Sequence, residues 1–301
     1  MVSPVNWSEK VASDYRTRII TDADNPILAF KANRDRYSNL PNQRNYAGLP
    51  YLGSWDSEDA VTWNTFRSLQ KAGTLDIVCH FLGIGDAEAL LLWTLAPAVD
   101  DVSAELQYKT GELIRRFDGV FRGQITEPDV ILLATKGIAV IECKPSEPDK
   151  APSHLWEGAL DSVRKRLPKY LAKNPELLKD YAREADVAEV YQLVRMAFYA
   201  VELGNEFSRQ PMVVSLANGR NWSCKISRLG KSASDLWGTF VNILGRGAPL
   251  CKAVFWQDFL GLLRGRGLKL LSSYLLTHPC LRMTPGEKQK RDSKVWNPSY
   301  P

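Results

Sequence analysis

The fold is decided by residues 127–144, which read Glu127-Pro-Asp-Val-Ile-Leu-Leu-Ala-Thr-Lys-Gly-Ile-Ala-Val-Ile-Glu-Cys-Lys144. Two short apolar runs, 130–134 and 138–141, flank Lys136-Gly137, and uninterrupted runs of this length are typical of buried strands. A glycine-containing turn between two such strands predicts a β-hairpin. We therefore expect residues 127–144 to form a hairpin with polar residues at its open end.

Three polar residues stand at that open end: Asp129, Glu142 and Lys144. With Lys136-Gly137 as a two-residue turn, Asp129 would lie opposite Lys144, and Glu142 would share its face. A bulge at the glycine would shift this register by one residue. Two carboxylates and an ammonium at the end of buried strands are costly unless they bind something.

A divalent cation would remove that cost. Mg²⁺, or Mn²⁺ in its place, takes oxygen ligands from carboxylates, carbonyls, water and phosphate. The expected ligands are Asp129, Glu142 and the backbone carbonyl of Cys143, with Lys144 beside a metal-bound water, where its charge favours hydroxide and stabilises the transition state. The alternative is that Asp129 is a turn residue and that Glu142 and Lys144 are solvated, mutually paired charges.

The pattern resembles the active-site signature of the PD-(D/E)XK phosphodiesterase superfamily, which includes many restriction endonucleases and recombination nucleases. The matching residues are Pro128-Asp129 and Glu142-Cys143-Lys144, on strands that would be the second and third of that fold's core. Two similar motifs, Pro148-Asp149 and Asp292-Ser-Lys294, have no adjoining apolar strand. The resemblance covers about residues 56–220 in the order of elements.

The resemblance implies an α/β restriction-endonuclease-like sandwich, with a central mixed β-sheet flanked by helices. It also implies a metal-dependent nuclease that hydrolyses phosphodiester bonds of DNA, an endonuclease rather than an exonuclease, in genome defence or repair. Two alternatives stay open: a catalytically silent nucleic-acid or protein-binding module on the same fold, and an RNA-directed nuclease, because nothing in the hairpin reads a 2′-hydroxyl. DNA is the expected partner, and a homodimer or a partner protein is compatible with the pattern.

Elsewhere the pattern alternates between helical and strand-like segments. Helices are expected over residues 57–73, 75–82, 86–95, 154–172, 185–204 and 256–271, and further strands over 113–122 and 212–216. Asp56 or Ser57 can cap the first helix, which directs Ala60, Trp63 and Phe66 inward. This order suits an α/β sandwich with a mixed sheet.

The same pattern divides the chain into three parts. Residues 1–55 are polar and weakly periodic, with only Ile27-Leu-Ala-Phe expected to be ordered, so this N-terminal segment is predicted to be irregular. Residues 56–284 would form the nuclease-like domain. The basic tail, 285–301, has no apolar period and is expected to be poorly ordered.

In this superfamily a helix preceding the strands often adds an acidic residue to the metal site. Glu58 is the preferred candidate, and Asp59 and Glu88 are others, although acidic residues in a first helical turn also stabilise the helix dipole without any catalytic duty. Glu112 and Asp118, on the strand expected at 113–122, could also approach the metal, and Asp118 is equally typical of a turn.

Two helical segments carry candidate substrate contacts. Gln192, Arg195 and Tyr199 follow one another at i, i+3 and i+7, hence along one stripe that suits a phosphate or a base, with Gln192 or Arg195 orienting the substrate. An exposed helix face explains the stripe equally well. The densest basic cluster could grip a nucleic-acid backbone, or be a solvated helix face. Its members are Arg164, Lys165, Arg166 and Lys169.

Composition narrows the class of protein. The 301 residues are 45% hydrophobic and 24% charged, in the ordinary globular range, and the net charge of +5 permits a polyanionic partner. No apolar run approaches a membrane span and the N-terminus has no signal-peptide pattern, so no membrane partner and a cytoplasmic location are expected. Scattered cysteines, isolated histidines and the lack of a phosphate-binding GxxxxGK[ST] loop argue against a zinc site, a Ser or Cys triad and a nucleotide cofactor.

Overall fold

The computed structural model describes residues 5–39, 43–55, 57–119, 127–144, 155–220, 222–223, 230–263 and 268–282, without the side chains of 155–162, 280 and 282. The predicted tail at 285–301 and the candidate cap Asp56 lie outside these residues. None of the helices in the described ranges combines the length and the apolar character needed to span a membrane.

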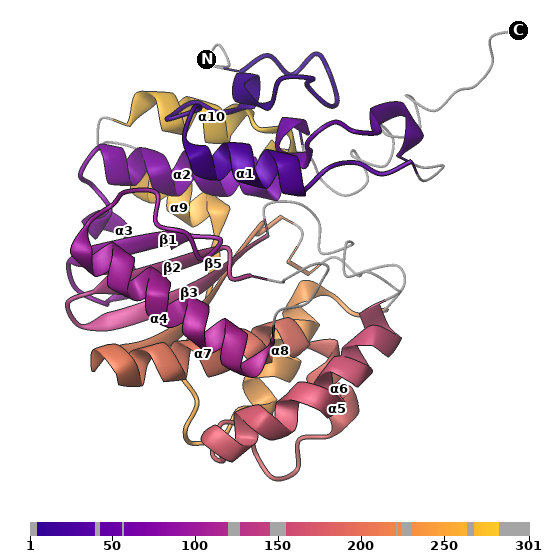
Figure 1. Cartoon of the computed structure of the whole chain (residues 1–301), viewed down its shortest axis with the longest axis vertical. Helices are drawn as coiled ribbons and strands as arrows, with labels where there is room; N and C mark the ends of the chain where they lie inside the picture. Colours follow the sequence, from indigo (N-terminus) through magenta and orange to yellow (C-terminus); the bar gives the residue numbers. More distant parts are fainter. Residues whose placement is uncertain are drawn as a thin grey trace, which may run out of the picture.

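A five-stranded mixed sheet lies at the centre of the molecule (Figure 1). The strands stand in sequence order: β1 (Ala87–Leu92), β2 (Val130–Ala134), β3 (Gly137–Lys144), β4 (Gln210–Ala217) and β5 (Leu250–Phe255). Strand β2 is antiparallel to both of its neighbours, β1 and β3, whereas β3, β4 and β5 are parallel to one another. The start of β2 and the end of β3 therefore meet at the same edge of the sheet.

Helices cover both faces of this sheet. They are α1 (Pro26–Arg34), α2 (Glu58–Lys71), α3 (Asp76–Leu82), α4 (Asp101–Phe117), α5 (Leu155–Lys173), α6 (Glu184–Glu189), α7 (Tyr191–Phe207), α8 (Ala233–Ile243), α9 (Trp256–Leu263), α10 (Lys269–Thr277) and α11 (Pro279–Arg282). Short 3-10 turns are η1 (Tyr15–Arg18), η2 (Arg44–Tyr46) and η3 (Tyr51–Gly53). The predicted α/β class, a mixed sheet flanked by helices, is confirmed.

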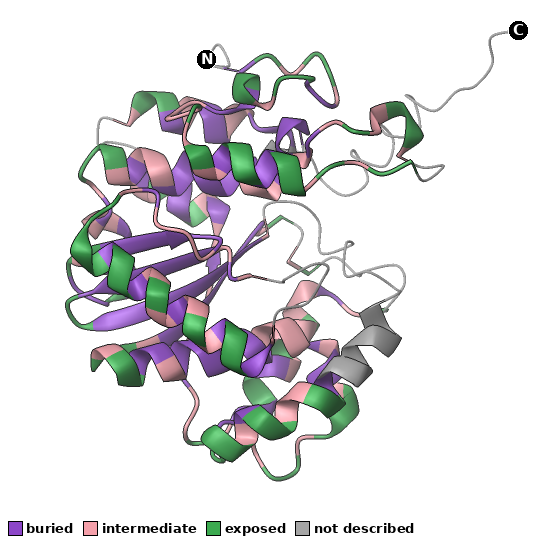
Figure 2. Ribbon diagram, in the orientation of Figure 1, coloured by how far each residue is buried: buried purple, intermediate pink, exposed green. Residues whose placement is uncertain are grey.

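Two hydrophobic cores lie on the two faces of the sheet, and the hairpin strands β2 and β3 between them are almost wholly buried (Figure 2). Alternate residues of β3 point to opposite faces: Ile141 and Cys143 join the core under α2 and α9, while Ile138 and Val140 join the core under α4 and α7. By this alternation Glu142 and Lys144 belong to the α7 face of the sheet.

The predicted helix beginning near Ser57 is confirmed as α2. Ser57 Oγ accepts a hydrogen bond from the Ala60 backbone nitrogen at 3.1 Å, which satisfies one of the helix's unpaired first-turn donors. Trp63 and Phe66 are fully buried, in line with the predicted inward face. This helix places Glu58 in its first turn, near the edge of the sheet where β3 ends.

Two predictions of secondary structure are wrong. The helix expected at 86–95 is β1, because Ala89 to Leu92 pair in a ladder with β2 and this tertiary pairing overrides the helical propensity of leucine. Residues 113–117 of the strand expected at 113–122 form the end of α4, in which Leu106, Thr110, Ile114 and Phe117 are buried at helical spacing, and residues 120–122 lie outside the described residues. The sequence of three strands is kept, but its first strand comes from different residues.

The remaining differences lie in the N-terminal segment and in the part of the chain that follows α5. The helices expected at 185–204 and 256–271 are each divided in two, as α6 with α7 and α9 with α10, and β5 and α8 were not predicted. The N-terminal segment is not irregular throughout, because α1 is capped by Asn25, whose Oδ1 accepts from the Ile27 nitrogen at 3.1 Å. Leu28 is fully buried in the core under α2, so this segment packs as part of the same body.

Candidate active site

The hairpin register differs from the predicted one. Val130 pairs with Ile141, so the next position places Asp129 opposite Glu142 rather than opposite Lys144. A shift by an even number of residues leaves every side chain on its original face. Asp129, Glu142 and Lys144 therefore still share one face of the sheet, with the two carboxylates as direct neighbours.

The register shifts because the turn is longer than two residues. The backbone nitrogens of Lys136 and Gly137 donate to the Ile84 carbonyl at 2.9 and 3.1 Å, and the Thr135 nitrogen donates to the Asp86 carbonyl at 2.9 Å. These donors bind the segment before β1 instead of closing a tight turn. Nothing in the sequence around the turn predicts that the carbonyls of Ile84 and Asp86 accept these hydrogen bonds.

Glu142 has two carboxylate oxygens in different situations. The residue is only 3% exposed, and its Oε1 lies 2.6 Å from Lys144 Nζ and accepts a hydrogen bond from Gln192 Nε2 at 2.6 Å. Its Oε2 is buried, and no hydrogen-bond partner for it exists among the described residues. A buried acceptor without a donor costs about 1–3 kcal/mol. A cation beside Oε2 would remove that cost.

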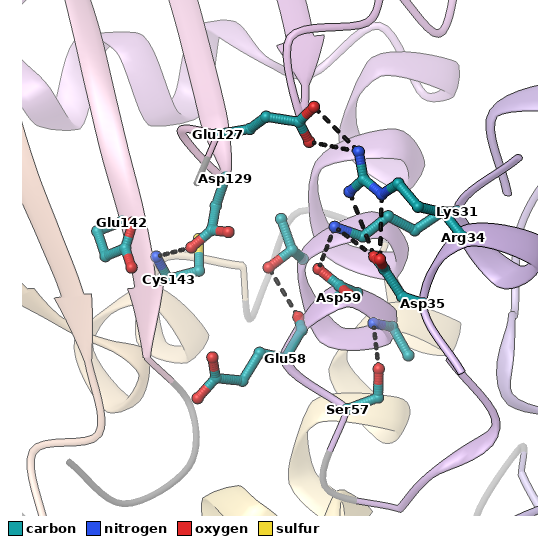
Figure 3. Close-up of polar contacts among 12 residues, drawn as sticks. Lys31, Arg34, Asp35, Ser57, Glu58, Asp59, Glu127, Asp129, Glu142 and Cys143 are labelled. Atoms are coloured by element: carbon teal, nitrogen blue, oxygen red, sulfur yellow. Dashed lines mark hydrogen bonds and ion pairs between the residues drawn. The ribbon is translucent and has the colours of Figure 1, made fainter. Parts of the chain in front are cut away.

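Asp129 lies opposite Glu142 in the hairpin register. Its Oδ2 accepts a hydrogen bond from the Cys143 backbone nitrogen at 2.8 Å (Figure 3). Burial raises the pKa of Asp129, and the negative charge of Glu142 raises it further, to well above its usual range, although Lys144 and the Cys143 amide act in the opposite direction. The two neighbouring carboxylates thus create a negative potential that favours a cation.

Lys144 stands between two glutamates. Its Nζ lies 2.6 Å from Glu142 Oε1 and 3.2 Å from Glu58 Oε2, and its side chain is 39% exposed. Burial lowers the pKa of Lys144, but the attraction of Glu142, Glu58 and Asp129 outweighs burial and holds the pKa well above its usual range. The residue therefore carries a permanent positive charge that a solvent-borne anion can reach.

These groups fit a hard divalent cation. Asp129 and Glu142 offer carboxylate oxygens, and the Cys143 carbonyl belongs to the residue between Glu142 and Lys144. Within the described ranges, no group of three or more His, Cys, Asp or Glu side chains converges as a complete ligand set. The carboxylates of Asp129 and Glu142 suit Mg²⁺, which usually keeps several waters and takes only one or two protein carboxylates.

The other acidic candidates are placed differently. Glu58 extends from α2 toward the end of β3, whereas Asp59, its neighbour, lies 3.3 Å from Lys31 Nζ (Figure 3). Glu88 lies at the start of β1, toward the opposite end of the sheet, where its Oε2 is 3.1 Å from Arg209 Nη2. The structure therefore brings Glu58 to Lys144, which also contacts Glu142, and keeps Glu88 away from this end of the sheet.

The predictions for Glu112 and Asp118 rested on a strand that does not exist. Glu112 is exposed on α4, where it accepts a hydrogen bond from Tyr108 at 2.9 Å. Asp118 is buried at the end of α4 and accepts hydrogen bonds from the hydroxyls of Tyr170 and Tyr199. Neither residue is part of the carboxylate pair on the hairpin.

Arg195 and Tyr199 belong to this same buried cluster. Arg195 is 3% exposed, with its Nη1 3.6 Å from Asp118 Oδ2, and Tyr199 is fully buried. The stripe on α7 thus turns toward α4 and α5 rather than toward solvent, and contact of these two residues with nucleic acid remains a prediction that their burial does not favour. Only Gln192, one helical turn earlier, reaches the candidate site.

The basic run on α5 is split between solvent and the interior. Arg164, Lys165 and Lys169 are exposed, and Arg164 pairs with Glu184 at 3.3 Å. Arg166 points instead toward Asp118, at 3.7 Å. Three of the four predicted contact residues thus stay on a solvated helix face, and their contact with nucleic acid remains a prediction.

Comparisons of the chain with protein-family models, curated proteins and solved structures return no match. The function must be argued from the site itself.

Sequence reasoning missed three charged residues close to the site: Lys31, Arg34 and Glu127, which Figure 3 shows between α1, α2 and the start of β2. A signal for part of this group exists in the sequence. Asn25-Pro26 is a typical helix start, with a side-chain cap followed by a proline whose missing N–H costs nothing there. It indicates α1, but not where the charged face of α1 points.

Proposed function

We propose that this chain is a Mg²⁺-dependent nuclease that hydrolyses phosphodiester bonds of DNA, with genome defence or repair as its setting. The proposal rests on the different surroundings of the two carboxylate oxygens of Glu142. Lys144 and Gln192 hold one of its oxygens, while the other is buried without a hydrogen-bond partner in the described chain, and the hairpin register places Asp129 opposite Glu142. A buried pair of acids that keeps an oxygen unsatisfied is unfavourable unless a cation binds there.

Each residue would have a separate task. Bound Mg²⁺ supplies a Lewis acid that lowers the pKa of a water molecule and neutralises charge on the phosphate. Asp129 and Glu142 hold the cation, and Gln192 fixes the rotation of the Glu142 carboxylate. Lys144 presents a permanent charge that stabilises the negative charge developing on the phosphate oxygens. Glu58 keeps the ammonium of Lys144 at the edge of the sheet.

The topology supports the same proposal. Asp129 immediately precedes β2, and Glu142 and Lys144 close β3, which are the second and third strands of the sheet. These are the strands on which the PD-(D/E)XK resemblance predicts the acidic residues and the lysine. Helix α2, which precedes α3 and the three antiparallel strands, carries Glu58, and the resemblance predicts a further acidic residue on a helix before the strands.

The test is cleavage of supercoiled plasmid and of single-stranded DNA with Mg²⁺ or Mn²⁺. Asp129→Ala, Glu142→Gln and Lys144→Ala are each expected to abolish metal-dependent nicking. Glu88→Gln is a matched control, because Glu88 is also an ion-paired acid of the sheet but lies away from the site. Single-stranded RNA of the same sequence, added as a competitor, separates a DNA enzyme from an RNA enzyme.

Two results would overturn the proposal. One is the absence of cleavage by the purified wild type with either metal on every substrate. The other is cleavage that survives in Asp129→Ala and Glu142→Gln. Metal-independent binding of DNA that persists in the Asp129→Ala and Lys144→Ala double variant, together with an inactive wild type, would identify a binding module on the same fold.

A further inference from the structure

The charged face of α1 reaches the segment that carries Asp129 (Figure 3). Arg34 Nη1 lies 3.0 and 3.1 Å from the two carboxylate oxygens of Glu127, while its Nε and Nη2 lie 3.0 and 3.2 Å from Asp35. Glu127 is 12% exposed and stands two residues before Asp129. Arginine contacts of this kind fix geometry as well as adding attraction. Helix α1 is therefore tied directly to the start of β2.

Lys31 provides a second route from α1 to Asp129. Its side chain is only 10% exposed, and its Nζ lies 3.3 Å from both Asp35 and Asp59 and 4.7 Å from the centre of the Trp93 ring. The Trp93 backbone nitrogen donates a hydrogen bond to the Asp129 carbonyl at 3.1 Å. Lys31 thus packs against the residue that holds the main chain of Asp129.

The backbone of Trp93 has a left-handed conformation that residues with a side chain do not prefer. Its φ is +50° and that of Thr94 is +67°, a left-handed region that costs a residue with a side chain roughly 1–2 kcal/mol. The indole is buried and stacked on Trp63, with ring centres 6.0 Å apart and an angle of 12°. Tertiary contacts of the ring, including Lys31, therefore maintain the geometry that places the Trp93 amide on Asp129.

We infer that α1 positions the proposed metal site, with Arg34 acting through Glu127. Asp129 precedes the β2 ladder, so strand pairing does not hold its side chain, and the neighbouring charge of Glu142 repels it. The contact of Arg34 with Glu127 holds the chain two residues before Asp129 in place. The role of α1 in metal binding rests on the proposed function. The inference also has a structural part that is independent of that function, namely that the hydrogen bond between Asp129 and the Cys143 amide depends on Arg34.

Nuclear magnetic resonance of the Cys143 amide tests this dependence without metal or substrate. The chain has five cysteines, so selective ¹⁵N-cysteine labelling gives few signals, and Cys143→Ser identifies the relevant one. An amide proton bound to a carboxylate resonates downfield. Arg34→Gln is expected to move the Cys143 signal upfield, in the direction that Asp129→Ala defines. An unchanged signal of Cys79, which is buried in α3, reports an intact fold.

A matched control separates positioning from general stabilisation. Arg209→Gln breaks a similar ion pair, Arg209 to Glu88 at 3.1 Å, toward the opposite end of the sheet and should leave the Cys143 signal unmoved. The charge-reversed double variant Arg34→Glu with Glu127→Arg should restore the wild-type signal. If Arg34→Gln changes the Cys79 signal, the variant Glu127→Gln is used in its place, because this substitution removes the charge of Glu127 and keeps the shape of its side chain.

Mn²⁺ titration followed by electron paramagnetic resonance completes the test. Arg34→Gln should bind Mn²⁺ about tenfold more weakly, as supporting residues around metal ligands usually do, and the double reversal should recover the affinity. A Cys143 signal that stays in place in both Arg34→Gln and Glu127→Gln overturns the inference, even if the wild type cleaves DNA. A signal that moves in a protein that never cleaves leaves the inference standing and overturns the proposed function instead.

Discussion

Replacing Asp129 by asparagine should stabilise the metal-free protein. Two unit charges roughly 5 Å apart, the spacing of directly opposed strand residues, repel by about 3 kcal/mol at an effective dielectric constant of about 20. Lys144, 2.6 Å from Glu142, offsets part of this repulsion. Asparagine can still accept the hydrogen bond from Cys143. We therefore expect a gain of about 1 kcal/mol, or a melting temperature about 2 °C higher in a chain of this size.

The assay is thermal unfolding in EDTA, with Glu88→Gln as the control that should lower stability slightly. The sign of the pH dependence follows from the raised pKa of Asp129. The folded protein binds the Asp129 proton more tightly than the unfolded chain does, so the wild type gains stability as pH falls through the folded-state pKa. The advantage of Asp129→Asn should shrink over the same range. A variant less stable than the wild type at neutral pH would refute the reasoning.

Three further predictions follow from other contacts. Lys144→Met should lower kcat for plasmid nicking by at least about 100-fold while Mn²⁺ affinity is kept or increased, and weaker metal binding would contradict the assigned role. Ser57→Ala removes the cap of α2 and should cost about 1 kcal/mol in urea unfolding, so an unchanged midpoint would count against the cap. Asp118→Asn leaves Arg195 and Arg166 facing a neutral group and should lower the free energy of unfolding, measured in urea, by about 3 kcal/mol. A variant as stable as the wild type would show that the cluster is not ionic.

The hairpin could be predicted from sequence because its information is local. Two apolar runs with a glycine between them determine both strands, and the even spacing of Glu142 and Lys144 determines their common face. The register could not be predicted in the same way. It depends on the Ile84 carbonyl, which captures the amides of Lys136 and Gly137, and this partner is distant in sequence.

The errors on both sides of the hairpin have one physical cause. Residues 89–92 are good helix formers that become β1 because β2 offers a ladder, and residues 113–117 mimic strand alternation inside a helix whose buried positions recur every three or four residues. Likewise, the polar stripe of Arg195 and Tyr199 is buried because Asp118, far away in sequence, supplies a partner. In each case a contact with residues distant in sequence determines the structure, and a single sequence does not predict such contacts.

The buried apolar side chains of the hairpin strands offset the unfavourable free energy of the acidic pair at its open end. Ile131, Leu132 and Val140 are fully buried, and each such side chain stabilises the fold by about 1.5–3 kcal/mol. These three alone exceed the few kcal/mol lost to the repulsion of Asp129 and Glu142 and to the unsatisfied Glu142 oxygen. The core can therefore hold an unfavourable pair of acids in place, as sites that bind a ligand commonly require. Asp129 lies outside the β2–β3 ladder, where the amides of Cys143 and Trp93 bind it, and the proposed contribution of α1 is to hold the chain that leads into it.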